Sequence, residues 1–461
     1  MPETELDLSQ PRVVHVVGVG GAGMSAIATI LVGMGHRVSG SDLRESPTLE
    51  RLRSIDVAVA VGHHADHLPD SLDAVVVSSA IPLSNPEVVA AGTRRIPVVR
   101  RAGALRAIVA TRNTIAVAGS HGKTTTSSML ALVLRAAGWH PSFLIGGDVN
   151  EVGTNAALDR GDRLVVEADE SDGTFLELVP HDAIVTSVLP DHLDHYGNFA
   201  ALVSAFERFL DAVPGLRVLC ADDATTASLA RGLDDRFVTY GFSDGSDYQM
   251  SAYEGGRLGT QFLLSCRGEP LGLVALPVPG QHNAVNAAGA AAAALELGAP
   301  FHAVTRALGS FGGVARRFQF RGERDGVTYV DDYAHLPSDV DAMIRAAREG
   351  RWGRVVVVFQ PHRYTRTASL WRDFADSFTG ADELVLTDVY PAGEPPQPGV
   401  SGRLVLRAVL DAHPDLPVVY LPRRADLVTH VPKLVRRGDV VLTLGAGDLT
   451  TAPDQWLTAG A

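Results

Sequence analysis

Residues 119–126, GSHGKTTT, have the composition of a phosphate-binding turn. They lie between TIAVAG, typical of a buried strand, and SSMLALVLRAAG, typical of a helix. Backbone N–H groups of such a turn and the following helix N-terminus cradle phosphates. The segment is shorter than the common P-loop, since Val117 stands where that motif has its first glycine and Gly119 supplies the turn. We expect Lys123 to reach a transferred phosphoryl group and Thr124 to bind Mg²⁺.

The scarcity of lysine supports this interpretation. Lys123 and Lys433 are the only lysines of the chain, and all its other strongly basic residues are arginines. A compact ammonium suits a tight loop in which a planar guanidinium would not fit. The sequence therefore predicts a point-charge role for Lys123.

Acidic residues and a histidine follow two further predicted strands. Glu167 ends the strand RLVVEA, and Asp169, Glu170 and Asp172 come directly after it. A carboxylate there faces a P-loop of the same sheet and can bind its metal ion, although a strand-end Glu can also be simply solvated. His192 in LPDHLDH is either a metal-linked imidazole or an ordinary loop histidine.

A glycine-rich turn, GVGGAGMS at residues 18–25, follows the strand VVHVV and opens a helix. Glycines there let backbone N–H groups approach a pyrophosphate at the helix N-terminus. Asp42 stands where a dinucleotide fold has its ribose-binding acid. The ligand could be NAD or another diphosphate, and the turn could also serve only to pack helix against strand.

Polar residues also follow two strands near the C-terminus. Arg363 and Arg366, in QPHRYTR, suit bidentate binding of a carboxylate or phosphate, although exposed arginines are common. His335 and the pair Asp331 and Asp332 follow another strand and could form a further wall of one cleft. For Asp331 a turn-capping role is equally expected.

The elements that position these residues predict an α/β fold with three domains. Short apolar strands alternate with helical runs throughout the 461 residues, a pattern of parallel sheets. The predicted domains are 1–108, Rossmann-like; 109–313, a central P-loop ATPase-like parallel sheet; and 314–461, Rossmann-like. We expect the segment GSFGGVARRFQ to form the junction between the second and third domains.

The amino-acid composition excludes several classes of protein. A formal net charge of -13 argues against a nucleic-acid coat and a polybasic membrane-surface protein, so phosphates must be held by local sites. The acidic start and the lack of a long apolar run predict a cytoplasmic protein without membrane insertion. Cys220 and Cys266 are too few for a disulfide framework.

Together the motifs resemble the Mur ligase family. The resemblance rests on GVGGAGMS, SHGKTTT, EADESDGTF, DHLDHYGN, GQHNAVNAAGA, RRFQF, DDYAHLP, FQPHRYTRT and GAGD, which span Gly18 to Asp448 in that order. It implies a UDP-sugar on the first domain, ATP on the second and an amino acid at the third. It also implies Mg²⁺, for which Mn²⁺ could substitute, and it allows a homodimer.

Matched position by position, the resemblance implies the following roles. The implied UDP-sugar residues are Gly18, Gly20, Gly21, Ala22, Gly23, Met24, Ser25 and Asp42. The implied ATP residues are Gly119, Ser120, His121, Gly122, Lys123, Thr124, Thr125, His282, Asn283, Asn286, Arg317 and Asp332. The implied amino-acid residues are His335, His362, Arg363 and Arg366, and the metal residues are Thr124, Glu167 and His192. The implied catalytic residues are Lys123, Glu167, His192 and Arg317.

The implied reaction joins L-alanine to the carboxylate of UDP-N-acetylmuramate through an acyl phosphate, in peptidoglycan precursor synthesis. Two alternatives stay open: a sister ligase that attaches a recycled murein peptide to the same sugar, and a non-catalytic nucleotide-sensing homologue. The chain departs from the family in having Ser187 and Leu189 where relatives usually have Asn and Glu, and Leu336 where they have a second histidine. We expect activity to be retained, and we expect Ser187 and Leu189 to raise the Mg²⁺ requirement.

Overall fold

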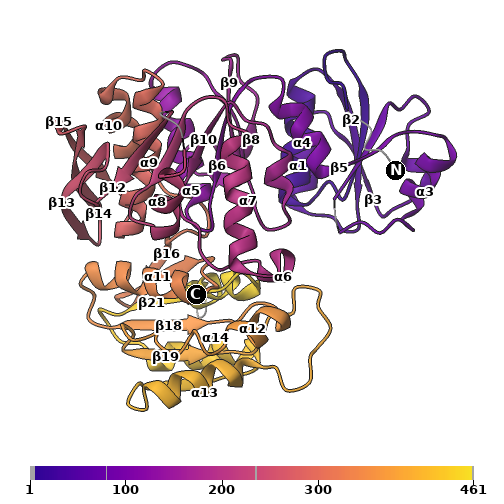
Figure 1. Ribbon diagram of the computed structural model, residues 1–461. Helices are drawn as coiled ribbons and strands as arrows, with labels where there is room; N and C mark the ends of the chain where they lie inside the picture. Colours follow the sequence, from indigo (N-terminus) through magenta and orange to yellow (C-terminus); the bar gives the residue numbers. More distant parts are fainter. Residues whose placement is uncertain (1–5, 79, 234–235, 459–461) are drawn as a thin grey trace. The chain divides into compact units, whose positions relative to one another are not determined.

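The computed structural model describes residues 6–78, 80–233 and 236–458. The chain forms two compact units, Met1–Ser251 with Leu263–Val274 and Val285–Leu308, and Ala252–Phe262 with Ala275–Ala284 and Gly309–Ala461. Three sheets with flanking helices make up the described residues and confirm the predicted α/β fold (Figure 1). The domain boundaries after residues 108 and 313 stay predictions.

The first sheet has five parallel strands in the order β3-β2-β1-β4-β5. Its strands are β1 (Val13–Val17), β2 (Arg37–Asp42), β3 (Ala58–Val61), β4 (Ala74–Val77) and β5 (Val98–Arg100). The helices are α1 (Ala22–Gly33), α2 (Pro47–Ser54), η1 (Ala65–His67), α3 (Pro86–Thr93) and α4 (Arg101–Val109). The central strand β1 is almost wholly apolar because helices cover both faces of such a sheet.

The second sheet has ten strands in the order β15-β14-β13-β12-β11-β10-β6-β9-β7-β8. They are β6 (Asn113–Ala118), β7 (Ser142–Val149), β8 (Thr154–Ala157), β9 (Arg163–Glu167), β10 (Asp182–Val185), β11 (Arg217–Cys220), β12 (Phe237–Gly241), β13 (Tyr248–Gly256), β14 (Gly259–Cys266) and β15 (Glu269–Leu276). The helices are α5 (Lys123–Ala136), η2 (Thr174–Glu177), α6 (Leu193–Tyr196), α7 (Phe199–Asp211), α8 (Ala224–Ala230), α9 (Gln281–Glu296) and α10 (Phe301–Gly309).

The order of the second sheet explains where its polar loops meet. Strand β6 pairs in parallel with β9 on one side and β10 on the other, so that Val117 lies opposite Glu167 and Ala118 opposite Val185. The segments that follow these three strands therefore leave the sheet at the same edge. Ligands of open α/β sheets bind at this carboxyl edge.

The third sheet has the order β16-β17-β21-β18-β19-β20, with β16 antiparallel to β17 and the other pairs parallel. Its strands are β16 (Gln319–Arg324), β17 (Val327–Asp332), β18 (Val355–Phe359), β19 (Glu383–Leu386), β20 (Val418–Tyr420) and β21 (Val440–Leu444). The helices are α11 (Pro337–Glu349), α12 (Tyr364–Leu370), α13 (Gly402–Ala412), α14 (Arg424–Leu434), η3 (Asp448–Thr451) and α15 (Ala452–Thr458).

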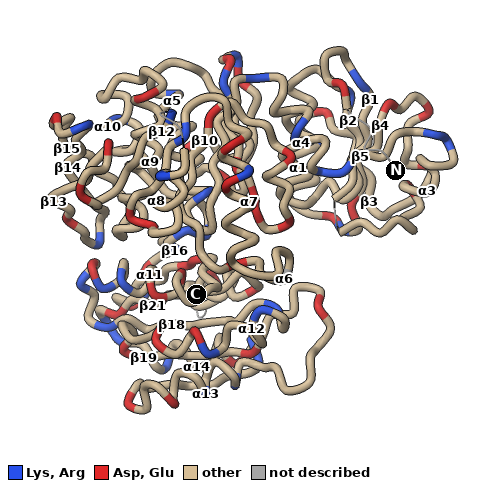
Figure 2. Tube along the Cα trace, in the orientation of Figure 1, with Lys and Arg blue, Asp and Glu red and all other residues tan. Residues whose placement is uncertain are grey.

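Charged residues are distributed along the whole chain. Figure 2 shows basic and acidic positions interspersed along the trace, in keeping with the expectation that phosphates are held by local sites. Among the described helices, none is long and apolar enough to cross a membrane.

Candidate active site

The turn between β6 and α5 forms the predicted phosphate cradle. Gly119 and Gly122 have φ values of +130° and +80°. A Cβ at Gly119 would overlap Thr186 Oγ1, and one at Gly122 would overlap the side-chain oxygen of Asn286. The turn thus requires glycine at both positions for conformation and for space. Helix α5 begins at Lys123, so its first N–H groups have no helical partners and are free of the helix's own hydrogen bonds.

Lys123 is held above this turn by its own side-chain contacts. Its Nζ donates to Gly119 O at 2.7 Å and to Glu170 Oε2 at 2.8 Å. Burial alone would lower the pKa of Lys123, but the nearby carboxylates, with Glu170 the strongest and Asp169 next, raise it. The ammonium therefore stays charged in the phosphate cradle.

Thr124 and Glu167 come together as predicted for metal-linked residues. Thr124 Oγ1 donates to Glu167 Oε1 at 3.1 Å, and the N–H of Gly146 donates to Glu167 Oε2 at 2.7 Å. No group of three or more His, Cys, Asp or Glu side chains that could hold a metal occurs among the described residues. Mg²⁺ typically takes one or two protein oxygens and completes its shell with waters and phosphates. The Thr124 and Glu167 oxygens fit that requirement.

His192 lies beside the carboxylates of Asp191 and Glu170. Its Nε2 is 3.2 Å from Asp191 Oδ2 and 3.8 Å from Glu170 Oε1. Tyr196, which the motif analysis passed over, donates its hydroxyl to the carbonyl of Glu170 at 2.5 Å. The structure thus places His192 beside Glu170, the residue that pairs with Lys123. The role of His192 in metal binding stays a prediction.

Two of the three departures from the family pattern, Ser187 and Leu189, contact the phosphate turn. Ser187 accepts a hydrogen bond from the N–H of His121 on its Oγ at 3.2 Å and from the N–H of Ser120 on its carbonyl at 2.8 Å. The N–H of Leu189 donates to Ser120 Oγ at 2.9 Å. Ser187 and Leu189 therefore support the backbone that carries the phosphate-binding N–H groups.

In the first sheet, the glycine-rich turn is organised by the end of β2. The N–H groups of Gly18 and Val19 donate to Ser41 O at 2.8 and 3.0 Å, and that of Gly20 donates to Asp42 Oδ2 at 2.9 Å. The predicted ribose-binding acid thus holds the turn itself. The N–H groups of α1's first turn have no preceding helical carbonyls to bind, so they are the donors that the prediction assigns to a pyrophosphate.

That first turn comprises Ala22, Gly23 and Met24, followed by Ser25, which donates its hydroxyl to Ala22 O at 3.0 Å. Gly21 precedes it, with its N–H bonded to Gly18 O at 3.2 Å. The predicted residues 18–25 therefore form one continuous turn and helix start.

Arg101 joins this turn to the acidic segment after β9, and sequence reasoning missed it. Its guanidinium Nη1 lies 3.4 Å from the position that a Cβ at Gly23 would take. Its Nη2 donates to Asp172 Oδ2 at 3.1 Å. An arginine at a helix start has no local signal that separates it from the exposed arginines of the chain. Only the chain fold reveals its position between the two segments.

Within the second unit, three of the predicted amino-acid residues come together. The rings of His335 and His362 are 5.7 Å apart, and Arg366 Nη1 is 3.1 Å from His362 Nδ1. Burial, together with the charges of His335 and Arg366, lowers the pKa of His362 to about 3. Because of this lowered pKa, the imidazole of His362 is neutral at physiological pH.

Arg363, the fourth residue of the set, is the residue before α12. It has a φ of +66°, and its N–H donates to Tyr390 O at 2.8 Å.

Asp332 and Arg317, two of the implied ATP residues, lie beside Tyr333. Asp332 is buried and accepts hydrogen bonds from the N–H groups of Phe318 at 2.6 Å and Ala334 at 2.7 Å. Burial raises its pKa to about 6, although Arg317 opposes the shift. The Arg317 guanidinium lies 5.3 Å from the Tyr333 ring centroid.

Three further implied ATP residues, His282, Asn283 and Asn286, lie at the start of α9. Asn286 is packed against Gly122 of the phosphate turn. Asn283 Nδ2 donates to Pro279 O at 2.7 Å. Burial lowers the pKa of His282 to about 4, so this imidazole is also neutral near pH 7.

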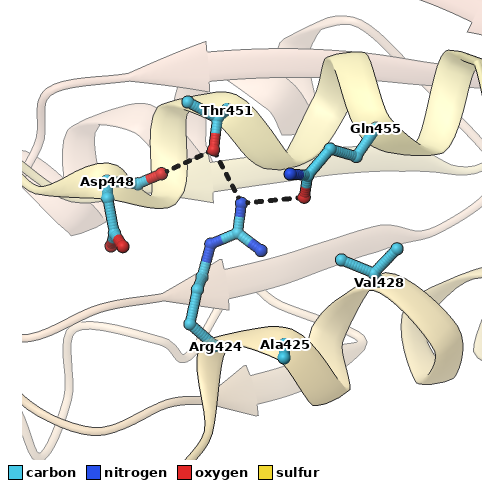
Figure 3. A pocket seen from close by; sticks show the side chains of 6 residues that line it. All are labelled: Arg424, Ala425, Val428, Asp448, Thr451 and Gln455. Carbon is cyan, nitrogen blue, oxygen red and sulfur yellow. Dashed lines mark hydrogen bonds between the residues drawn. The ribbon is translucent and has the colours of Figure 1, made fainter.

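A separate hollow of about 440 Å³ lies between α14 and the segment from η3 to α15 (Figure 3). Arg424 Nη2 donates to Thr451 Oγ1 at 2.9 Å and to Gln455 Oε1 at 3.2 Å across it. Of the motif residues, it includes only Asp448, which accepts from Gln360 Nε2 at 2.9 Å. None of the predicted substrate-binding residues lines this hollow.

Comparisons with known proteins match a segment of the chain for each of the three sheets. Residues 13–113 match the Mur ligase family catalytic domain, 117–294 the Mur ligase middle domain, and 316–447 the Mur ligase glutamate ligase domain. A UDP-N-acetylmuramate–L-alanine ligase of Anaeromyxobacter sp. (strain Fw109-5) is 47% identical over 97% of this chain and 98% of the relative.

Two solved structures are similar over 97% of this chain and 98% of their own. The UDP-N-acetylmuramate–alanine ligase of Thermotoga maritima has a TM-score of 0.82 at 30% identity. A murein peptide ligase of Psychrobacter arcticus 273-4 has a TM-score of 0.71 at 25% identity. The matched segments, the relatives and the assembled phosphate turn agree, and the chain belongs to the Mur ligase family.

Proposed function

We propose that the chain joins L-alanine to the carboxylate of UDP-N-acetylmuramate, with ATP converted to ADP and phosphate. The observation that carries the proposal is the convergence of Lys123, Thr124 and Glu167 at the phosphate turn. Similarity to the Anaeromyxobacter ligase over nearly the full length supports these substrates. We place the reaction in the cytoplasm, where ATP is available.

The chemistry needs an activated carboxylate. A carboxylate is a poor acyl donor because oxide would have to leave, so the carboxylate oxygen first takes the γ-phosphoryl group of ATP and releases ADP. The alanine amine then attacks the acyl carbon, phosphate leaves, and the amine loses a proton. Lys123 and the N–H groups at the start of α5 neutralise charge on the transferring phosphoryl group.

The oxygens of Thr124 and Glu167 would hold Mg²⁺. When bound with ATP, Mg²⁺ neutralises phosphate charge, and Mn²⁺, which also accepts oxygen ligands, could replace it. Glu167 is oriented for this task by the N–H of Gly146.

On the amine side, we assign His335, His362, Arg363 and Arg366 to alanine binding. An arginine fork binds a carboxylate bidentately. Because His362 is neutral, it adds no further cation to repel the alanine ammonium before that group loses its proton. We assign His282, Asn283 and Asn286 to adenine, and Arg317 and Asp332 to the phosphate and ribose.

Attachment of a murein peptide instead of alanine is the second candidate, supported by the likeness to the Psychrobacter structure. The higher identity to alanine ligases favours alanine. Phosphate release with alanine, glycine, serine and a tripeptide distinguishes the two. A preference for the tripeptide would favour the sister ligase, and no release with any amine would favour a non-catalytic homologue.

A further inference from the structure

Glu87 is a charged side chain in the interior of the first sheet's domain. It has no solvent exposure and lies in the first turn of α3, where its N–H donates to the capping side chain of Asn85 at 2.9 Å. A buried carboxylate is costly unless its oxygens are hydrogen-bonded. The reaction proposed above gives this residue no task.

Groups from four segments face the carboxylate of Glu87. Ser41 of β2 donates its hydroxyl to Oε2 at 2.6 Å, and His63, after β3, has Nδ1 3.1 Å from the same oxygen. His67 of η1 has Nδ1 3.1 Å from Oε1, and His15 of β1 has Nε2 3.7 Å from it. Burial would raise the pKa of Glu87, but the nearby imidazole of His15 and the hydrogen bond from Ser41 outweigh it and lower the pKa to about 2. The carboxylate is therefore ionised at neutral pH.

Ser41 connects this buried carboxylate to the glycine-rich turn. While its hydroxyl is bonded to Glu87, its carbonyl accepts the N–H groups of Gly18 and Val19. The next residue, Asp42, accepts the N–H of Gly20. The end of β2 thus fixes three successive amides of the turn, and Glu87 anchors that strand end to α3.

We propose that Glu87 is a positioning residue for the UDP-sugar. It acts through Ser41, which keeps the glycine-rich turn in the conformation that presents the first N–H groups of α1 to the pyrophosphate. This inference rests on the proposed function, which places UDP-N-acetylmuramate at that turn. Glu87 itself is enclosed and touches no substrate.

The test uses steady-state kinetics of Glu87→Gln, Ser41→Ala and the double variant. Loss of a hydrogen bond to a charged group predicts a roughly tenfold rise in KM for UDP-N-acetylmuramate in each single variant. The kcat at saturation and the KM for ATP should stay within about twofold. Because both changes break one link, the double variant should show no larger effect than Glu87→Gln.

Val38→Ala is the matched control. Val38 is buried on the same strand, three residues before Ser41, and so its side chain lies on the opposite face of the sheet. It should lower the thermal unfolding temperature and leave KM for the UDP-sugar unchanged. If Glu87→Gln does not fold, calorimetry of UDP-sugar binding to Ser41→Ala tests the same link.

Three results would overturn the inference: an unchanged KM in either single variant, an equal rise in KM for ATP, or additive effects in the double variant. A wild-type protein that releases no phosphate with UDP-N-acetylmuramate, ATP and alanine would instead contradict the proposed function. The two failures are therefore distinguishable.

Discussion

Lys123 Nζ lies 2.8 Å from the buried Glu170 Oε2, directly above the turn that begins at Gly119. The contact fixes the position of the Lys123 ammonium, because the same Nζ also donates to the Gly119 carbonyl. His192 and Tyr196 lie against Glu170 in turn. We therefore expect a phosphoryl group that binds at this turn to meet an ammonium that is already oriented.

Lys123→Ala and Lys123→Arg should both lose turnover, by at least about a hundredfold, because the enclosed space suits a point charge and not a planar fork. Lys433→Arg is the control, since Lys433 is exposed on α14 and is the only other lysine. Phosphate release and thermal unfolding of the three variants are the measurements. Near-normal activity of Lys123→Arg would contradict the point-charge role.

Glu167→Gln should raise the Mg²⁺ concentration for half-maximal activity at least about tenfold, since it removes the charge of one of two adjacent oxygen ligands. Binding of Mn²⁺ to the ATP-loaded protein, followed by electron paramagnetic resonance, should weaken in parallel. Glu207→Gln, at an exposed position of α7, should change neither. Equal metal affinity of the wild type and Glu167→Gln would place the ion elsewhere.

Arg101→Ala should raise KM for UDP-N-acetylmuramate roughly tenfold, because it removes a guanidinium beside the first turn of α1. Its ion pair with Asp172 is partly exposed, so stability should change little. Arg106→Ala, exposed on the same helix, serves as the comparison. The same KM in both variants would remove Arg101 from the substrate site.

The buried His282 should make the free energy of unfolding depend on pH below neutrality. Its pKa is lowered from 6.5 to about 4, so the unfolded chain binds its proton more readily than the folded one. The stability that the neutral His282 allows is fully present above pH 6.5. As pH falls from 6.5 toward 4, the free energy of unfolding decreases by about 1.4 kcal/mol per pH unit. Urea unfolding between pH 4.5 and 7.5 should give a flatter profile for His282→Gln. Parallel profiles would show that this histidine does not titrate on unfolding.

Local patterns were enough to predict the phosphate turn and its neighbours. Strand, glycine turn and helix occur consecutively around Lys123, and parallel strand order brings Glu167 to the same edge. The structure placed Thr124 and Glu167 together accordingly. The individual ligand assignments and the homodimer stay predictions.

Contacts between distant residues could not be predicted in this way. Ser41 and Glu87 are 46 residues apart, and Arg101 and Asp172 are 71 apart, with no periodicity to connect them. Asp42 was expected to bind ribose because of its position at the end of the second strand, but its carboxylate also accepts a hydrogen bond from the N–H of Gly20. Leu189 replaces a polar residue that relatives usually have, but its backbone N–H still donates to the side chain of Ser120.

The most direct test of the proposed reaction is phosphate release measured with each substrate omitted in turn. We expect release only when ATP, UDP-N-acetylmuramate and L-alanine are all present, with one amide formed for each phosphate released. Release that is independent of the UDP-sugar, or no release with all three substrates, would contradict it.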